Sequence, residues 1–306
     1  MISIVVPCMD EEYAIPIFYD EIVRFQDKLE ELELIFVDDG STDHTLARIK
    51  DLQEKDARIH YVSFSRNFGK EAALLAGLEA SKGDYVVTID ADLQDPPSLM
   101  PEMYRILKED GSRYDCVAAR RQDRKGEPAV RSFFARMFYR MANRILDIKI
   151  ADGARDYRFM TRKMVDAVIR DKEYNRFSKG LYAWVGFETK WIAYKNVERS
   201  AGDTKWSFWK LFRYSMEGIL AYTTIPLSVI SVIGIMTFFL SFSGLAFVII
   251  RAAMYGDPVG GWPSLVCIIS LHGGLILLCL GIIGLYLSKI YLETKKRQIY
   301  IIREQG

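Results

Sequence analysis

The sequence predicts a mainly parallel α/β domain followed by two membrane-spanning helices. Short β-branched and apolar runs alternate with segments of helical periodicity in the N-terminal part, a pattern typical of a parallel sheet covered by helices on both faces. Near the C-terminus, no residue is charged between Glu217 and Arg251 or between Asp257 and Lys289. Each gap exceeds the roughly 20 residues that a helix needs to cross a bilayer. The alternative, a buried core hairpin, is disfavoured because the apolar runs are uninterrupted.

The elements can be followed in order from the N-terminus. Each expected strand is a short apolar run, and each expected helix repeats its apolar residues at helical spacing. The strands are expected over residues 2–6, 34–37, 59–62, 85–89 and 116–118, and the helices between them over residues 15–29, 45–52, 70–80 and 99–107. The two membrane spans follow at residues 225–250 and 262–288.

Composition excludes several classes of protein. The formal net charge of +1 gives no indication of a nucleic-acid partner, and none is expected. The four cysteines form no Cys-x-x-Cys pair, so neither a zinc site nor a disulfide framework is indicated. The loop at residues 7–12 has no glycine-rich turn, which disfavours a dinucleotide-binding enzyme. The N-terminus lacks the features of a signal peptide, so the soluble part is expected to stay in the cytosol.

Carboxylates follow the fourth expected strand, where Asp90-Ala91-Asp92 comes directly after Ile89. In an open α/β sheet, ligands bind beyond the carboxyl ends of the strands. Aspartate oxygens at that place suit Mg²⁺ or Mn²⁺ carrying a diphosphate. The alternative is a solvated strand end with helix-capping acids.

Two further strand ends carry charged side chains. Asp38 and Asp39 end the second strand, where carboxylates can accept hydrogen bonds from the imide N–H of uracil or from ribose hydroxyls. Arg66 and Lys70 follow the third strand, where a nucleotide diphosphate would need neutralising; a solvated basic loop is the alternative. Three strand ends therefore converge on one kind of ligand.

The motifs at these strand ends resemble the family 2 glycosyltransferases with the GT-A fold, and the resemblance covers the whole soluble part. It is carried by Pro7 to Glu11, Val37-Asp38-Asp39-Gly40-Ser41, Arg66-Asn67-x-Gly69 and Asp90-Ala91-Asp92-x-Gln94-x-Pro96-Pro97. Within that family, the chain most resembles the polyisoprenyl-phosphate glycosyltransferases, the group of bactoprenol glucosyltransferase and dolichol-phosphate mannose synthase. This narrower resemblance is carried by residues 156–160, 175–177, 180–187 and 201–205.

The resemblance implies roles for individual residues. It assigns nucleotide binding to Pro7, Glu11, Asp38, Asp39, Arg66, Lys70 and Asp90. The metal, Mg²⁺ or Mn²⁺, falls to Asp92, Gln94 and Asp90, and the Gln is informative because an amide oxygen is a plausible hard ligand. The family's usual Tyr-Asn before the glutamate is Met9-Asp10 here, a departure that affects contacts of these two side chains with the base.

The same resemblance assigns catalysis to Asp156, Asp90 and Arg158. Asp156 occupies the position of the catalytic base that is proposed for the family. An acceptor phosphate has its second pKa near 6 and is already largely ionised at neutral pH. The alternative is therefore that Asp156 orients the acceptor rather than removing a proton from it.

Basic residues after the fifth strand predict an acceptor-phosphate site. Arg121 and Arg124 lie in a charged cluster, Arg131 lies in the segment 129–146, and Lys205 precedes the first span. The segment 129–146 is a basic amphipathic helix that suits an anionic membrane surface, although core packing explains its aromatic stripe equally well. Solvated surface charge is the alternative for the cluster.

The predicted domains are a cytosolic GT-A domain at residues 1–205, an amphipathic juxtamembrane segment at 206–224, two membrane helices within 225–289, and a cytosolic basic tail at 290–306. The excess of lysine and arginine after the second span, against the loop between the spans, places both termini in the cytosol. We expect the plasma membrane of a bacterium. His272, inside the second span, is expected to form a hydrogen bond with the neighbouring helix, and a proton relay is the alternative.

Small residues on the second span favour close helix contact. Ser270, Gly274 and Gly281 share one face, so a homo-oligomer packed through the spans is predicted. The alternative is that they pack against the first span of the same chain, at Gly234, Ser241 or Gly244.

The function implied by the resemblance is inverting transfer of a hexose from a nucleotide diphosphate sugar, UDP-glucose or UDP-N-acetylglucosamine, to a polyprenyl phosphate such as undecaprenyl phosphate. A processive polysaccharide synthase is the alternative enzyme, but its Gln-x-x-Arg-Trp motif is not found and two spans hardly conduct a polymer. A non-catalytic membrane protein that binds a nucleotide sugar is the alternative from another class.

Overall fold

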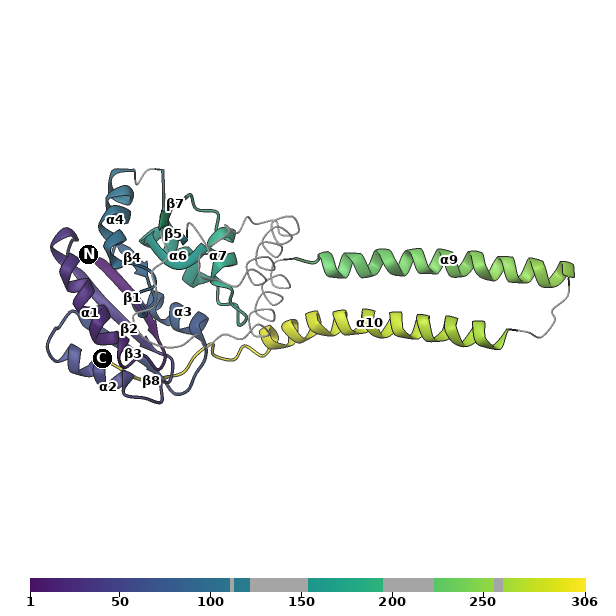
Figure 1. Ribbon diagram of the computed structural model, residues 1–306, viewed down its shortest axis with the longest axis horizontal. Coiled ribbons are helices and arrows are strands. Elements are labelled where there is room, and N and C mark those ends of the chain that lie inside the picture. Colours follow the sequence, from purple (N-terminus) through teal and green to yellow (C-terminus); the bar gives the residue numbers. More distant parts are fainter. Residues whose placement is uncertain (111–112, 122–153, 195–222, 256–260) are drawn as a thin grey trace. The chain divides into compact units, whose positions relative to one another are not determined.

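The computed structural model describes residues 1–110, 113–121, 154–194, 223–255 and 261–306 (Figure 1). The chain divides into two compact units, the first comprising Met1–Gly218 and Arg297–Gly306 and the second comprising Ile219–Lys296. The expected interfacial helix at 129–146, most of the juxtamembrane segment, and Arg124, Arg131 and Lys205 lie outside the described residues.

The first unit is built on an eight-stranded sheet with the order β7-β5-β6-β4-β1-β2-β3-β8 among the described residues. The strands are β1 (Ile2–Cys8), β2 (Leu32–Asp38), β3 (Ile59–Phe64), β4 (Tyr85–Thr88), β5 (Cys116–Arg121), β6 (Ala154–Thr161), β7 (Thr189–Tyr194) and β8 (Ile302–Gln305). Neighbours among β1 to β4 pair in parallel, β6 is antiparallel to both β4 and β5, and β8 is antiparallel to β3. The predicted mainly parallel α/β fold is confirmed.

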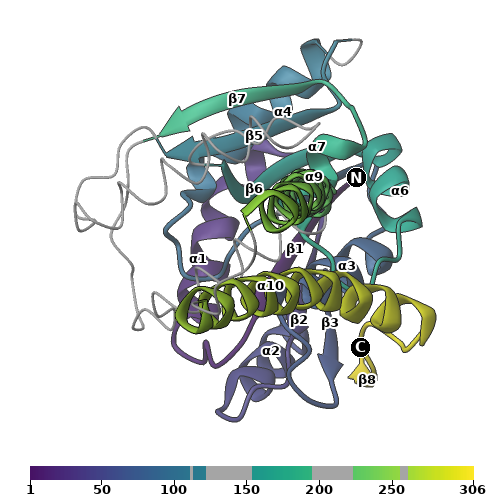
Figure 2. The same ribbon diagram turned by 90° about the vertical axis from the view of Figure 1, so that its right-hand side faces the viewer.

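Helices cover both faces of the sheet (Figure 2). On one face, a core joins Ile4 of the sheet to the helices that contain Phe18 and Met103. On the opposite face, Val5 and Val37 of the sheet lie in two further cores, which pack against the helices on that face. The helices are α1 (Ala14–Phe25), α2 (Thr45–Gln53), α3 (Lys70–Ala80), α4 (Met100–Glu109), α6 (Arg162–Arg170) and α7 (Ser178–Trp184), with short 3₁₀ turns at Gln26–Lys28 and Pro97–Leu99.

Three strands, β6, β7 and β8, were not predicted. β7 pairs in parallel with β5 at the edge of the sheet. β6 spans Ala154–Thr161, where charged residues interrupt the apolar run, and it is defined by its pairing with β4 and β5. The residues expected to form a basic tail instead continue α10 to Thr294 and then form β8 at the edge of the sheet. β8 has the mostly polar sequence Ile-Arg-Glu-Gln, which lacks the hydrophobic pattern by which a strand is predicted from sequence.

The second unit consists of two long apolar helices, α9 (Ile225–Tyr255) and α10 (Trp262–Thr294). Both are long and apolar enough to cross a membrane, within Ile225–Gly244 and Leu271–Thr294. The predicted hydrogen bond of His272 is confirmed, since its Nε2 lies 3.2 Å from the hydroxyl of Ser241 on α9. A Cβ atom built on Gly234, Gly244, Gly274 or Gly281 would meet no described atom within 4 Å, so these glycines make no close contact within the hairpin.

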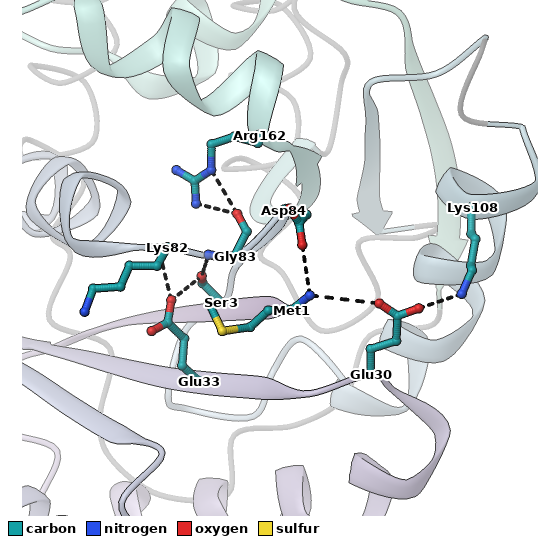
Figure 3. Close-up of polar contacts among 9 residues, drawn as sticks. All are labelled: Met1, Ser3, Glu30, Glu33, Lys82, Gly83, Asp84, Lys108 and Arg162. Atoms are coloured by element: carbon teal, nitrogen blue, oxygen red, sulfur yellow. Dashed lines mark hydrogen bonds and ion pairs between the residues drawn. The ribbon is translucent and has the colours of Figure 1, made fainter.

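A buried polar network fixes the amino ends of the central strands (Figure 3). The hydroxyl of Ser3 donates to Glu33 at 2.5 Å, and the backbone N–H of Lys82 donates to the same carboxylate oxygen at 2.8 Å. Gly83 donates its N–H to Ser3 at 2.8 Å, and its carbonyl accepts from Arg162. A Cβ on Gly83 would lie 2.8 Å from the carbonyl oxygen of Met1, so the turn before β4 has no room for a side chain.

Gly83→Ala is expected to destabilise the first unit, because the added methyl group forces backbone apart at β1. Overpacking of this kind costs about 2 kcal/mol, which lowers the melting temperature of a domain of this size by roughly 5 °C. Thermal unfolding of the purified protein in detergent measures this. Lys82→Ala is the matched control, since it removes an exposed side chain and keeps the N–H bonded to Glu33. Equal melting temperatures for both variants would contradict the packing argument.

Candidate active site

The charged strand ends meet at one edge of the sheet. β1, β2, β3 and β4 are parallel neighbours, so the loops that follow them lie together. β6 runs in the opposite direction beside β4, with Arg158 opposite Thr88, so its first residues, including Asp156, reach the same edge. The sequence predicted the convergence of the parallel strands, and the antiparallel strand β6 completes it.

Lys70 joins the two acids that were assigned to catalysis. Its ammonium nitrogen lies 2.7 Å from a carboxylate oxygen of Asp90 and 2.7 Å from a carboxylate oxygen of Asp156. Burial lowers the pKa of Lys70, but the charges of Asp156 and Asp90 outweigh it and raise that pKa above its ordinary value. The ammonium therefore stays charged and links the start of α3 to the ends of β4 and β6.

The same ion pairs keep Asp156 ionised. Burial raises the pKa of Asp156, but the nearby ammonium groups of Lys70 and Lys179 outweigh burial and hold the pKa well below its usual range. A carboxylate with a depressed pKa is a weak base. This favours the alternative in which Asp156 orients a substrate by its charge.

Asp38 and Asp39 hold the loops around them. Asp38 accepts hydrogen bonds from the N–H of Ser41 at 3.0 Å and from the hydroxyl of Ser63 at 2.8 Å. Asp39 accepts from the N–H groups of Phe68, at 2.6 Å, and Gly69. Both aspartates are buried, so their carboxylates fix the β2–α2 and β3–α3 loops. The sequence pattern indicated only ligand groups at these two positions and did not predict this structural use.

The first two loops are cross-linked by hydrogen bonds. Asp10, whose φ of 52° is left-handed, donates its N–H to Ser41 and accepts from the N–H of Thr42 at 2.9 Å. The N–H of Glu11 donates to the hydroxyl of Thr45 at 2.7 Å. Met9-Asp10, which departs from the family pattern, is thus part of the loop framework. Pro7 lies on β1 opposite Val37.

The loop after β4 is supported by a buried network that the sequence analysis missed. Asp95 is 1 % exposed and accepts from Arg155 at 3.3 Å and from the hydroxyl of Tyr194. Arg155 also donates to the amide oxygen of Gln94 at 3.0 Å. Burial raises the pKa of Asp95, an effect that Arg155 partly offsets. Asp95 stands in the same acidic run as Asp92, but its partners on β6 and β7 are distant in sequence.

The donor groups in this loop are suited to a hard cation. Asp90 and Asp92 offer carboxylate oxygens and Gln94 an amide oxygen, the ligand types that Mg²⁺ and Mn²⁺ take. No three His, Cys, Asp or Glu side chains are grouped as a ready metal site in the described part of the chain. Lys70 holds Asp90 and Arg155 holds Gln94, so a cation would compete with these two groups. The donor atoms of these residues fit a hard cation in their chemistry.

Arg158 is buried beside the site rather than exposed in it. Its side chain is 4 % exposed and its guanidinium lies 4.4 Å from the ring centre of Tyr182 and 5.4 Å from that of Trp191. Its Nε has no hydrogen-bond partner among the described residues. The prediction that Arg158 meets a substrate directly therefore does not match its burial, although its charge helps to lower the pKa of Asp156.

The remaining predicted residues are placed only in part. Arg66 is exposed, and its guanidinium lies 4.0 Å from the ring centre of Phe68. Arg121 ends β5. The acceptor-phosphate site assigned to Arg121, Arg124, Arg131 and Lys205 stays a prediction.

A parallel sheet of this order, with acids at the strand ends and an antiparallel strand inserted beside β4, is a GT-A-like glycosyltransferase fold. Residues 3–169 match the family described as Glycosyl transferase family 2, to which the chain belongs.

Similar proteins match along almost the whole chain. A "Putative glycosyltransferase CsbB" of Bacillus subtilis is 41% identical over 99% of this chain and 92% of its own length. A "Bactoprenol glucosyl transferase" of Shigella phage SfX is 40% identical over 99% of both chains. The predicted family and its bactoprenol-type relatives are confirmed.

A solved structure of glucosyl-3-phosphoglycerate synthase from Mycobacterium tuberculosis, in complex with Mn²⁺, UDP-glucose and phosphoglyceric acid, has a TM-score of 0.48 and 23% identity. It covers 72% of this chain and 77% of its own.

Asp39→Asn is expected to change the pH dependence of stability. Burial raises the pKa of Asp39 to about 6, so in the wild type its contribution to stability is full below about pH 4 and lost as the pH rises to about 6. Two pKa units correspond to at most about 3 kcal/mol.

Melting temperatures measured from about pH 4 to about pH 7 should therefore rise with pH in the variant relative to the wild type. Asp51→Asn, at an exposed site on α2, is the control and should follow the wild type. A constant difference between Asp39→Asn and the wild type at every pH would contradict the raised pKa.

Proposed function

We propose that the protein transfers glucose from UDP-glucose to a polyprenyl phosphate, with undecaprenyl phosphate as the acceptor, at the cytosolic face of a bacterial plasma membrane. The observation that carries the proposal is the ion-paired set of Lys70, Asp90 and Asp156 where the parallel strands end. Full-length relatives described as bactoprenol glucosyl transferases support the acceptor and favour glucose over N-acetylglucosamine.

The donor diphosphate is assigned to the charged loops. Arg66 is exposed on the β3–α3 loop, which Asp39 fixes, and a phosphate group can pair with it there. Glu11 and Pro7 border the same edge from β1, and Asp38 and Asp39 contribute by holding their loops in place.

Asp90, Asp92 and Gln94 would hold Mg²⁺ or Mn²⁺. Bound there, the cation would act as a Lewis acid that neutralises charge on the leaving diphosphate. The competing contacts of Lys70 and Arg155 leave the same loop ordered before the cation binds.

The reaction needs little proton removal. An oxygen of the acceptor phosphate attacks the anomeric carbon, the bond to the diphosphate oxygen breaks on the opposite face, and UDP leaves, which inverts the anomeric centre. The acceptor phosphate is largely a dianion at neutral pH and is its own nucleophile. Asp156, which Lys70 keeps ionised, would orient the sugar or stabilise the positive charge that develops on it.

The membrane hairpin suits a lipid-bound acceptor. The chain enters α9 from the first unit and returns to that unit after α10, where β8 pairs with β3. Both connections therefore belong on one side of the bilayer, which agrees with an even number of spans. The basic residues near the end of α10 favour the cytosolic side. No observation favours the processive synthase or the non-catalytic binding protein over this function, and oligomerisation through the spans stays a prediction.

The proposed function is tested by incubating the purified protein in lipid with labelled UDP-glucose or UDP-N-acetylglucosamine and undecaprenyl phosphate. We expect labelled glucose on the lipid, with a β linkage because the α-linked donor is inverted. Absence of lipid-linked sugar with every nucleotide donor would contradict it.

Asp156→Asn is expected to keep measurable activity, because the acceptor phosphate supplies its own negative charge. The loss in kcat should stay below about a hundredfold, and the rate should still rise as the phosphate ionises near pH 6. Loss of an obligatory base costs up to about 10⁴-fold. Asp166→Asn, at a partly exposed position on α6, is the control. Complete inactivity at every pH, with a normal melting temperature, would restore the role of a base.

Asp92→Asn is expected to lose transfer activity and Mn²⁺ affinity together, because it removes a charge from a partly exposed loop and disturbs no core. Electron paramagnetic resonance of added Mn²⁺ measures binding independently of turnover. Asp110→Asn, at the exposed end of α4, should behave as the wild type. Unchanged Mn²⁺ affinity in Asp92→Asn would remove this residue from the metal site.

A further inference from the structure

The C-terminal segment, residues 299–306, contacts the β3–α3 loop that carries Arg66. Beyond the β8 ladder, Tyr61 and Gly306 exchange backbone hydrogen bonds at 2.9 and 3.1 Å. The N–H of Ser65 donates to the carbonyl of Ile301 at 3.0 Å. The last residue before Arg66 is thereby bonded to a part of the chain more than two hundred positions away.

A row of aromatic rings continues from this segment into the loop. The ring of Tyr300 stacks on Phe64, with ring centres 4.9 Å apart and planes at 16°. Phe64 meets Phe68 edge to face at 5.7 Å, and the guanidinium of Arg66 lies 4.0 Å from the ring centre of Phe68. The hydroxyl of Tyr300 donates to Glu79 on α3, the helix that begins with Lys70.

Edge protection does not account for Tyr300. The edge of β3 would be open to pairing with another chain, and residues 302–305 of β8 protect it by pairing with it. Tyr300 precedes the ladder, and its ring and hydroxyl both contact elements that carry the loop, namely β3 and α3. Aromatic pairs of this geometry are each worth about 0.5–1.5 kcal/mol beyond the area they bury.

We propose that Tyr300 is a positioning residue for nucleotide binding. Through Phe64 and Phe68 it holds the β3–α3 loop in the conformation that presents Arg66 to the diphosphate of the donor. An irregular loop loses conformational entropy when it is ordered, and a loop ordered in advance binds its ligand more tightly. The proposal rests on the proposed function, in which Arg66 meets the donor diphosphate. It also gives Tyr300, which follows α10, a role in nucleotide binding.

The test compares three variants of the full-length protein in lipid. Tyr300→Leu removes the ring, Tyr300→Phe keeps the ring and removes the hydroxyl, and Glu304→Ala removes the ion pair of β8 with Lys50. UDP affinity, donor KM and kcat are measured together with the melting temperature. We expect Tyr300→Leu to weaken UDP binding and raise donor KM by about fivefold to tenfold while kcat changes less than about threefold. Tyr300→Phe and Glu304→Ala should keep wild-type affinity.

Phe68→Leu tests the other end of the row if Tyr300→Leu does not fold, because it removes the ring that contacts both Phe64 and Arg66 and leaves the C-terminal segment intact. It should also raise donor KM selectively. Wild-type UDP affinity in a folded Tyr300→Leu or Phe68→Leu variant would overturn the positioning role and leave the proposed function standing. Equal losses in Glu304→Ala would overturn it too, since strand closure alone would then suffice. A wild-type protein that binds no UDP would remove the proposed function itself.

Discussion

The site depends on one electrostatic constraint, the ammonium group of Lys70 held between two carboxylates. Asp90 follows β4 and Asp156 lies near the start of the paired strand β6. Like charges placed together there would repel each other and raise one pKa. The single cation balances part of their charge at 2.7 Å from each. The start of α3, the end of β4 and the start of β6 are therefore fixed relative to one another before any ligand binds.

The acids around this centre divide into two groups with different tasks. Asp38, Asp39 and Asp95 are buried and bonded to protein donors, so they shape the loops. Asp90, Asp92 and Asp156 are partly exposed at the same edge and carry the charge that a cation or sugar can meet. Burial of a charge is costly unless it is hydrogen-bonded, which explains why each buried acid has several donors.

The sequence was sufficient for features that depend on local pattern. The β–α alternation, the apolar spans and the strand-end acids all follow from periodicity and from the rule that ligands bind where parallel strands end. It was insufficient where partners are distant. β6 and β8 are defined by pairing, and Asp95 meets Tyr194 only because β7 joins the sheet beyond β5. Motif matching also gave Asp39 a ligand role without showing that the N–H groups of Phe68 and Gly69 occupy its carboxylate.

The protonation state of Asp156 tests the central claim most directly. Infrared difference spectra between the wild type and Asp156→Asn, recorded from about pH 4 to about pH 8, isolate the carboxyl band of this residue. The ion pair with Lys70 predicts a carboxylate band throughout, because the pKa lies well below the usual range. A protonated carboxyl band that titrates near neutral pH would contradict the account and identify Asp156 as a general base.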